Sequence, residues 1–255
     1  MNRSLFDSIH LRVKCRWVRR ETLKIHKAAP ATRIASSLSC VEILTALHYG
    51  GVRIFDPQRP LHENRDRLIL SKGHGAISFY PILADLGCIH PRELLTVARE
   101  GTRLGGIPDC IIPGFETTNG SLGHGLGVAC GMALALRLKK MKQTVFVLVG
   151  DGELYEGSIW EAVMFAGHHG LDNIVLIVDD NGASMLDFSR NIINLQPLPP
   201  KFTAFGWDAR ETDGHDAAGL VTLLAKLKNT RQGRPKVLVA RTVKGRGAPR
   251  LETDP

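Results

Sequence analysis

The sequence lacks a Cys-x-x-Cys pair. The number of cysteines is odd and their positions are scattered: Cys15, Cys40, Cys88, Cys110 and Cys130. Disulfide frameworks and zinc sites use close, regular cysteine spacings, usually in even numbers. The pattern therefore indicates reduced thiols and predicts a cytoplasmic protein.

Other features are also missing. No apolar run is long enough to cross a bilayer, so no membrane-spanning segment is expected. The formal charge is +8, but no block of Lys and Arg is interleaved with aromatic residues, which make up only 6% of the chain. Nucleic-acid binding is therefore not expected, and the charge suits phosphorylated ligands or an acidic partner. The absence of Gly-x-Gly-x-x-Gly after the first predicted strand argues against a nucleotide-binding Rossmann protein.

Two continuous apolar runs, at 144–149 and 173–179, are the most regular feature that is present. Such runs are typical of strands that are buried on both faces of a parallel sheet. Residues 156–169 lie between them and carry apolar residues at helical spacing, which predicts a right-handed crossover helix. With the other alternating strands and helices, this unit predicts a doubly wound α/β fold with helices on both faces of the sheet.

Polar residues follow both runs, Gly150-Asp151-Gly152 after the first and Asp180-Asn181 after the second. Both groups are expected at the carboxyl ends of neighbouring strands, where open α/β sheets bind ligands. Asp151 offers a carboxylate oxygen and Asn181 a carbonyl oxygen, which Mg²⁺ accepts together with phosphate and water. Gly152 lets the backbone approach a phosphate closely. The pattern predicts a site for a metal-bridged diphosphate; the alternative is an ordinary turn with a helix N-cap.

The remaining elements complete a single predicted domain, 1–255, with a long Pro-rich loop at 182–201. Helices are expected at 4–28, 40–49, 75–85, 126–138 and 217–228, and further strands at 68–70 and 236–242. Ser37 or Ser39 is a plausible N-cap of the second helix.

The first helix carries an apolar residue at every fourth position, namely Leu5, Ile9, Val13 and Trp17. A basic N-terminus of this kind also suits a mitochondrial presequence. Asp7 and Glu21 favour an ordinary packing helix instead.

Three motifs resemble transketolases. GDGELYEGSIWEA followed by IVDDNGAS resembles the family's thiamine-diphosphate motif, and RLILSKGHGA and ETTNGSLGHG resemble two of its cofactor loops. The resemblance runs from about Trp17 to Gly247. It implies the diphosphate-binding (PP) domain of that family, with thiamine diphosphate and Mg²⁺ or Ca²⁺ as cofactors.

The resemblance also assigns roles to individual residues. It implies that Asp151, Asn181 and the carbonyl of Ala183 hold the metal. It assigns His74 and Glu156 to catalysis, and Glu161 with Glu156 to a water-filled passage between two cofactors. The residues implied to contact the cofactor are Ser36, His74, Gly120, Ser121, Leu122, Gly152, Asn181 and Lys244.

Two positions depart from the family pattern. Arg33 and Ile107 stand where transketolases have histidines that contact hydroxyl groups of the donor sugar, unless the alignment slips there. Arg33 keeps a positive charge that matches a carboxylate or phosphate, whereas Ile107 makes the wall apolar. These two candidate substrate residues put the ordinary ketose-phosphate donor in doubt.

Only part of a transketolase is represented, because the resemblance lacks the domain that binds the aminopyrimidine. The chain stops at Asp254-Pro255, before the family's usual Trp-His segment. The implied protein is the N-terminal subunit of a split transketolase, in a heterotetramer with two copies of a C-terminal subunit. It would transfer a two-carbon ketol unit from a ketose phosphate to an aldehyde. The alternatives are a thiamine enzyme of a specialised pathway, acting on a modified sugar, a 2-oxoacid or a carrier-protein thioester, and a non-catalytic scaffold.

Overall fold

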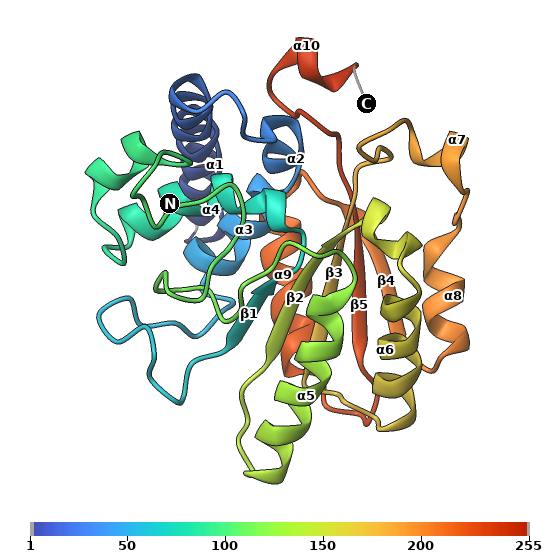
Figure 1. Cartoon of the computed structure of the whole chain (residues 1–255). Coiled ribbons are helices and arrows are strands. Elements are labelled where there is room, and N and C mark those ends of the chain that lie inside the picture. Colours follow the sequence, from blue (N-terminus) through green and yellow to red (C-terminus); the bar gives the residue numbers. More distant parts are fainter. Residues whose placement is uncertain (1–2, 254–255) are drawn as a thin grey trace.

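The computed structural model describes residues 3–253, with side chains from residue 8 onward. Within these residues, five parallel strands form one sheet in the order β1-β2-β3-β5-β4 (Figure 1). The strands are β1 (Arg67–Leu70), β2 (Val145–Gly150), β3 (Ile174–Asp180), β4 (Asp208–Asp213) and β5 (Lys236–Arg241). The predicted α/β fold with a parallel sheet is confirmed.

Helices cover both faces of this sheet. α5 (His124–Leu138), α6 (Gly157–His168) and α8 (Leu198–Ala204) pack on the face that is turned to the viewer in Figure 1. On the opposite face lie α1 (Arg3–Ala28), α3 (Val41–Tyr49), α4 (Ala76–Asp85) and α9 (Ala217–Asn229). Successive strand residues enter opposite layers, so Val147 packs with the first group of helices and Leu148 with the second.

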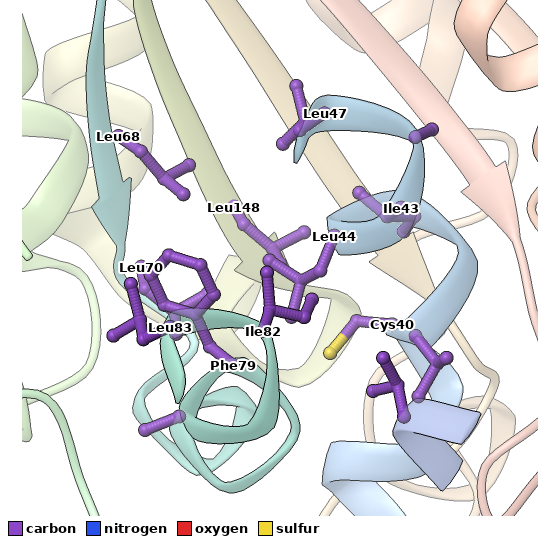
Figure 2. Close-up of a cluster of buried hydrophobic side chains, with 14 of the residues drawn as sticks. Cys40, Ile43, Leu44, Leu47, Leu68, Leu70, Phe79, Ile82, Leu83 and Leu148 are labelled. Carbon is purple, nitrogen blue, oxygen red and sulfur yellow. The ribbon is translucent and has the colours of Figure 1, made fainter. Parts of the chain in front are cut away.

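The layer formed by α3 and α4 is dense and apolar where it meets β1 and β2 (Figure 2). Leu44 of α3, Phe79 of α4 and Leu148 of β2 belong to one core cluster, and each is fully buried. Interiors of this kind are close-packed, so a shift of α4 would be resisted by its neighbours. This matters for function because α4 begins directly after the SKGH motif.

The central strand-helix-strand unit agrees with its prediction to within one or two residues. Gly150 pairs with Asp179 at the ends of β2 and β3, so the residues that follow the two strands emerge side by side. Between them, the 3₁₀ helix η3 (Asp151–Tyr155) precedes α6. The short elements elsewhere are α2 (Ile34–Ser39), η1 (Gly73–Gly75), η2 (Pro91–Thr96), α7 (Ser189–Ile192) and α10 (Pro249–Glu252).

The first helix packs on the core as predicted, and Trp17 contacts it. The rest of the four-residue repeat does not mark the buried face: Ile9 and Val13 are exposed, and the buried positions of α1 include Leu11, Cys15 and Val18. The four-residue repeat drifts around a helix with 3.6 residues per turn, whereas the buried set alternates steps of four and three. Leu5 and the chain end at Asp254-Pro255 lie outside the residues whose side chains are described.

Two further predictions need correction. Ser37 and Ser39 lie inside α2 rather than at a helix N-cap; the residue before α3 is Cys40, which makes no side-chain cap. Segment 182–201 is not structureless, because it contains α7 and the first turn of α8. Among the described helices, none combines the length and apolarity needed to cross a membrane.

Candidate functional site

Four strand ends converge on one edge of the sheet. β1 leads into the SKGH turn, β2 into η3, β3 into Asn181, and β5 into Lys244. A cleft of about 240 Å³ opens at this edge. It is lined by most of the residues that the sequence singled out: Ser36, His74, Leu122, Asp151, Gly152, Glu156, Asn181 and Ala183.

The Asp151 carboxylate is the most telling group in the cleft. Its Oδ2 accepts hydrogen bonds from Ser189 Oγ at 2.7 Å and from the Gly182 N–H at 3.1 Å. Burial raises the pKa of Asp151 to about 6, the Ser189 bond opposes this, and the charges of Asp180 and Asp179 add to it. A buried carboxylate with too little positive charge beside it is stabilised in its ionised form by a divalent cation. The residues at this site therefore fit a bound divalent metal ion.

Asn181 and Ala183 belong to the turn that follows β3. The Ala183 N–H donates to Asn181 Oδ1 at 3.1 Å, which keeps the amide oxygen at the strand end beside Asp151. Among the described residues, no group of three or more His, Cys, Asp or Glu side chains could hold a metal ion. One carboxylate plus neutral oxygens is a typical protein share of a Mg²⁺ site that also uses ligand phosphates.

His74 is half-buried at the rim, in the tight turn η1. Ser37 Oγ donates to the His74 carbonyl and thereby fixes the turn against α2. Burial lowers the pKa of His74, and the nearby charges of Lys72, Arg33 and Lys244 lower it further. The imidazole is therefore kept neutral at neutral pH, so that one ring nitrogen donates a hydrogen bond and the other accepts one.

Lys72, two residues before His74, has a position in the site that the sequence did not predict. Its ammonium group pairs with Asp179 at the end of β3 and donates to Ser39 Oγ at 2.9 Å. Burial is the largest single effect and lowers the pKa of Lys72, but the charge and hydrogen bond of Asp179, together with the other nearby negative groups, outweigh burial and raise the pKa. Lys72 lines the cleft, and because Asp179 compensates its charge, the pair joins the SKGH turn to the end of β3 without adding net charge to the site.

Glu153 was also missed, although it stands inside the GDGELYEG motif. Its Oε1 accepts from Ser71 Oγ at 2.5 Å and from the Gly123 N–H at 3.0 Å. Burial raises the pKa of Glu153, against the effect of the Ser71 bond. One carboxylate thus ties together the three loops whose motifs resemble transketolase, a role that only the folded contacts reveal.

Lys244 and Arg33 lie in a second hollow, of about 260 Å³, that adjoins the cleft at Ser36. Lys244 is buried and donates from Nζ to the Ser184 carbonyl at 2.6 Å. Arg33 is exposed immediately before α2. The predicted cationic residues therefore sit beside the cleft rather than in its lining.

The remaining predicted residues lie outside the cleft lining. Gly120 and Ser121 are exposed in the loop before α5, and Glu161 is exposed on α6. Ile107 packs between this loop and the SKGH turn, since a Cβ built on Gly120 would lie 2.7 Å from Ile107 Cδ1. Ile107 therefore forms an apolar corner between two of the motif loops.

The fold and the site define a class: parallel α/β proteins with a ligand cleft at the carboxyl ends of their strands. Comparison with known families gives a more specific result. The family described as "Transketolase, thiamine diphosphate binding domain" matches residues 24–254 of the chain. The chain belongs to the transketolase family.

Two relatives of similar length are named as subunits. The chain is 39% identical over 244 residues to the 6-deoxy-6-sulfo-D-fructose transketolase subunit of a Clostridium species, covering 95% of this chain and 88% of that protein. It is 36% identical over 234 residues to an apulose-4-phosphate transketolase subunit of Phocaeicola vulgatus, covering 92% of this chain and 83% of that protein.

Solved structures agree with the fold. Transketolase from Campylobacter jejuni superposes with a TM-score of 0.88 at 27% identity, over 100% of this chain and 40% of that one. Transketolase from Leishmania mexicana superposes with a TM-score of 0.85 at 28% identity, over 93% of this chain and 37% of that one. The chain thus corresponds to less than half of these longer enzymes.

Proposed function

We propose that this chain is the N-terminal, diphosphate-binding subunit of a split transketolase, folded as one PP-type domain in the cytoplasm. The enzyme transfers a two-carbon ketol unit from a ketose or ketose phosphate to an aldehyde acceptor. The observation that carries the proposal is that Asp151 and Asn181 follow the ends of two adjacent strands and line one cleft together with His74.

The proposed roles follow from the positions of the residues. Asp151, Asn181 and the Ala183 carbonyl hold Mg²⁺ or Ca²⁺, and the Gly152 N–H binds a phosphate oxygen. Thiamine diphosphate, when bound, supplies the carbanion chemistry. The cofactor contacts are completed by Ser36, Lys244, Gly120, Ser121 and Leu122.

His74 is the proposed group for proton control at the reacting carbonyl. A neutral imidazole held by its turn can donate a hydrogen bond to a developing alkoxide. Glu156 stands at the cleft edge, just before α6, and we assign it to relaying protons along the subunit interface.

The active enzyme requires a second subunit, which contributes the pyrimidine-binding domain and the C-terminal domain. The proposed assembly has two copies of each subunit, and α5 and the Glu156/Glu161 face of α6 are the proposed contact surfaces. The names of the subunit-length relatives support a split enzyme.

A second candidate is a transketolase of a specialised pathway with an atypical donor or acceptor. It is favoured by the substrates that the names of those relatives give, a sulfonated ketose and a branched sugar phosphate. It is also favoured by Arg33 and Ile107, which replace the expected sugar-binding histidines.

Calorimetric titration of thiamine diphosphate with Mg²⁺ tests the main proposal. We expect tight binding only when this chain is mixed with its partner subunit, and loss of that binding in Asp151→Ala. The matched control is Glu63→Ala, which removes an exposed carboxylate in the loop before β1. Equal binding by the wild-type chain with and without partner would refute the split enzyme, and absence of binding in both would favour the scaffold.

A further inference from the structure

The hollow beside the cofactor cleft is lined by residues 32–36, Met185 and Lys244; we name it the Arg33 hollow. Its volume, about 260 Å³, is comparable with that of the cleft itself. Ser36 and Met185 border both spaces, so the hollow adjoins the cleft.

The charge of the hollow has one sign. Arg33 and Lys244 are its charged lining residues, and no Asp or Glu of the described chain lines it, whereas the cleft is lined by Asp151, Glu153 and Glu156. Within the described residues, the Arg33 guanidinium makes no hydrogen bond or ion pair with another side chain. A planar guanidinium that faces a hollow without a carboxylate partner suits a bidentate oxyanion.

The hollow is coupled electrostatically to His74, the residue proposed for proton control at the reacting carbonyl. Burial lowers the pKa of His74, and the charges of Lys72, Arg33 and Lys244 lower it further. Leu122, which lines the cleft, is apolar and offers no side-chain hydrogen bond to a sugar hydroxyl. An anion bound by Arg33 would therefore sit near the reacting carbonyl rather than at the far end of a sugar chain.

We propose that the Arg33 hollow binds an oxyanion of the substrate next to its reacting carbonyl, which makes Arg33 a specificity-determining residue for 2-oxoacid-type substrates. This inference rests on the proposed function. It adds an anion subsite that is distinct from the diphosphate contacts.

The test compares donors in the complex of this chain with its partner subunit, loaded with thiamine diphosphate and Mg²⁺. Hydroxypyruvate carries a carboxylate beside the carbonyl, erythrulose is uncharged, and xylulose 5-phosphate carries its charge at the far end. For Arg33→Gln we expect kcat/KM to fall roughly 10- to 100-fold with hydroxypyruvate and to change less than about threefold with erythrulose. Arg33→Lys keeps the positive charge but loses the two parallel N–H donors of the guanidinium. Its kcat/KM with hydroxypyruvate should therefore lie between the values of wild type and Arg33→Gln.

Three outcomes would overturn the inference. One is an equal loss with hydroxypyruvate and erythrulose. Another is a loss confined to xylulose 5-phosphate, which would mean that Arg33 binds a distant phosphate. The third is a loss of thiamine diphosphate affinity in Arg33→Gln as large as the loss of kcat/KM, which would assign Arg33 to the cofactor. The matched control is Arg92→Gln in η2, away from the cleft.

A second measurement separates this inference from the proposed function. If the complex transfers no ketol unit from any donor, the proposed function fails. A binding measurement then still tests whether the Arg33 hollow takes an oxyanion. Pyruvate is then titrated into the complex and followed by NMR at the Arg33 Nε–H, which is identified by its absence in Arg33→Gln. A saturable shift with pyruvate but not with dihydroxyacetone is expected; no shift overturns the hollow as an oxyanion site.

Discussion

At the scale of single residues, His48 shows how the fold fixes a protonation state far from the site. Its Nδ1 donates to the Leu44 carbonyl at 2.8 Å, and its Nε2 accepts from Arg53 Nη1 at 3.0 Å. Both nitrogens are therefore occupied in the neutral ring, although one edge of His48 remains partly exposed. Burial, together with the charge of Arg53, lowers the pKa of His48 to about 3 from 6.5.

This histidine makes the protein sensitive to acid. Because the folded pKa lies below the unfolded one, the unfolded chain binds more protons between about pH 6.5 and pH 3, and stability falls as the pH drops through that range. His48 alone should cost about 2 kcal/mol between pH 7 and pH 5. Urea unfolding at both pH values should show a smaller loss in His48→Gln than in wild type. Identical losses in the two proteins would contradict the assignment.

Residue-level prediction from the sequence succeeded where a side chain follows a recognisable strand. Asp151 and Asn181 were placed correctly because the apolar runs before them locate two strand ends. Lys72 and Glu153 were missed because their partners, Asp179 and Ser71, are distant in sequence. A charged residue in a loop usually faces water, and only long-range contacts identify the buried exceptions.

At the scale of elements, the junction between the GSL loop and α6 depends on Gly123. Its φ is +85°, a left-handed conformation that side chains with a Cβ rarely adopt. A Cβ at this position would lie 2.7 Å from Glu156 Cβ and would also clash with Ser158. The close approach brings Leu122 and Glu156 together at the cleft.

A pair of glycine substitutions in the same region should have opposite effects. Gly123→Ala should destabilise the chain by about 2–4 kcal/mol, from backbone conformation and overpacking. Gly127→Ala should stabilise it by about 0.5–1 kcal/mol, because Gly127 lies inside α5 and nothing lies within 4 Å of a Cβ built there. Equilibrium unfolding in urea measures both. A neutral Gly123→Ala would show that the loop relaxes freely.

The strands were predicted from the apolar pattern of their residues, and the prediction failed where that pattern is weak. β2 and β3 are buried along their whole length and were predicted within a residue or so. β4 was not predicted, because Asp208–Asp213 forms the sheet edge and is largely polar. Strand pairing there comes from its neighbour β5 rather than from the hydrophobicity of its own residues.

At the scale of the whole molecule, the two faces of the sheet are covered unequally. α1, α3, α4 and α9 bury one face under a thick layer, with α1 packed over α3 and α4. On the other side α5, α6 and α8 form a single layer (Figure 1). Apolar side chains on α5 and α6 are left exposed. Val128 of α5 and Met164 and Phe165 of α6 are each at least 40% exposed. Exposed apolar side chains on adjacent helices are typical of a contact surface.

Met164→Asp should separate assembly from folding. Because Met164 is exposed, the free energy of unfolding of the isolated chain should change by less than about 0.5 kcal/mol. A buried charge at the proposed interface should weaken association with the partner by about tenfold or more, as measured by sedimentation velocity. Leu61→Asp is the matched control: Leu61 is also exposed, but it lies in the loop before β1, at the amino ends of the strands. If both variants assemble like wild type, α6 does not contact the partner, and the interface must be sought on another face.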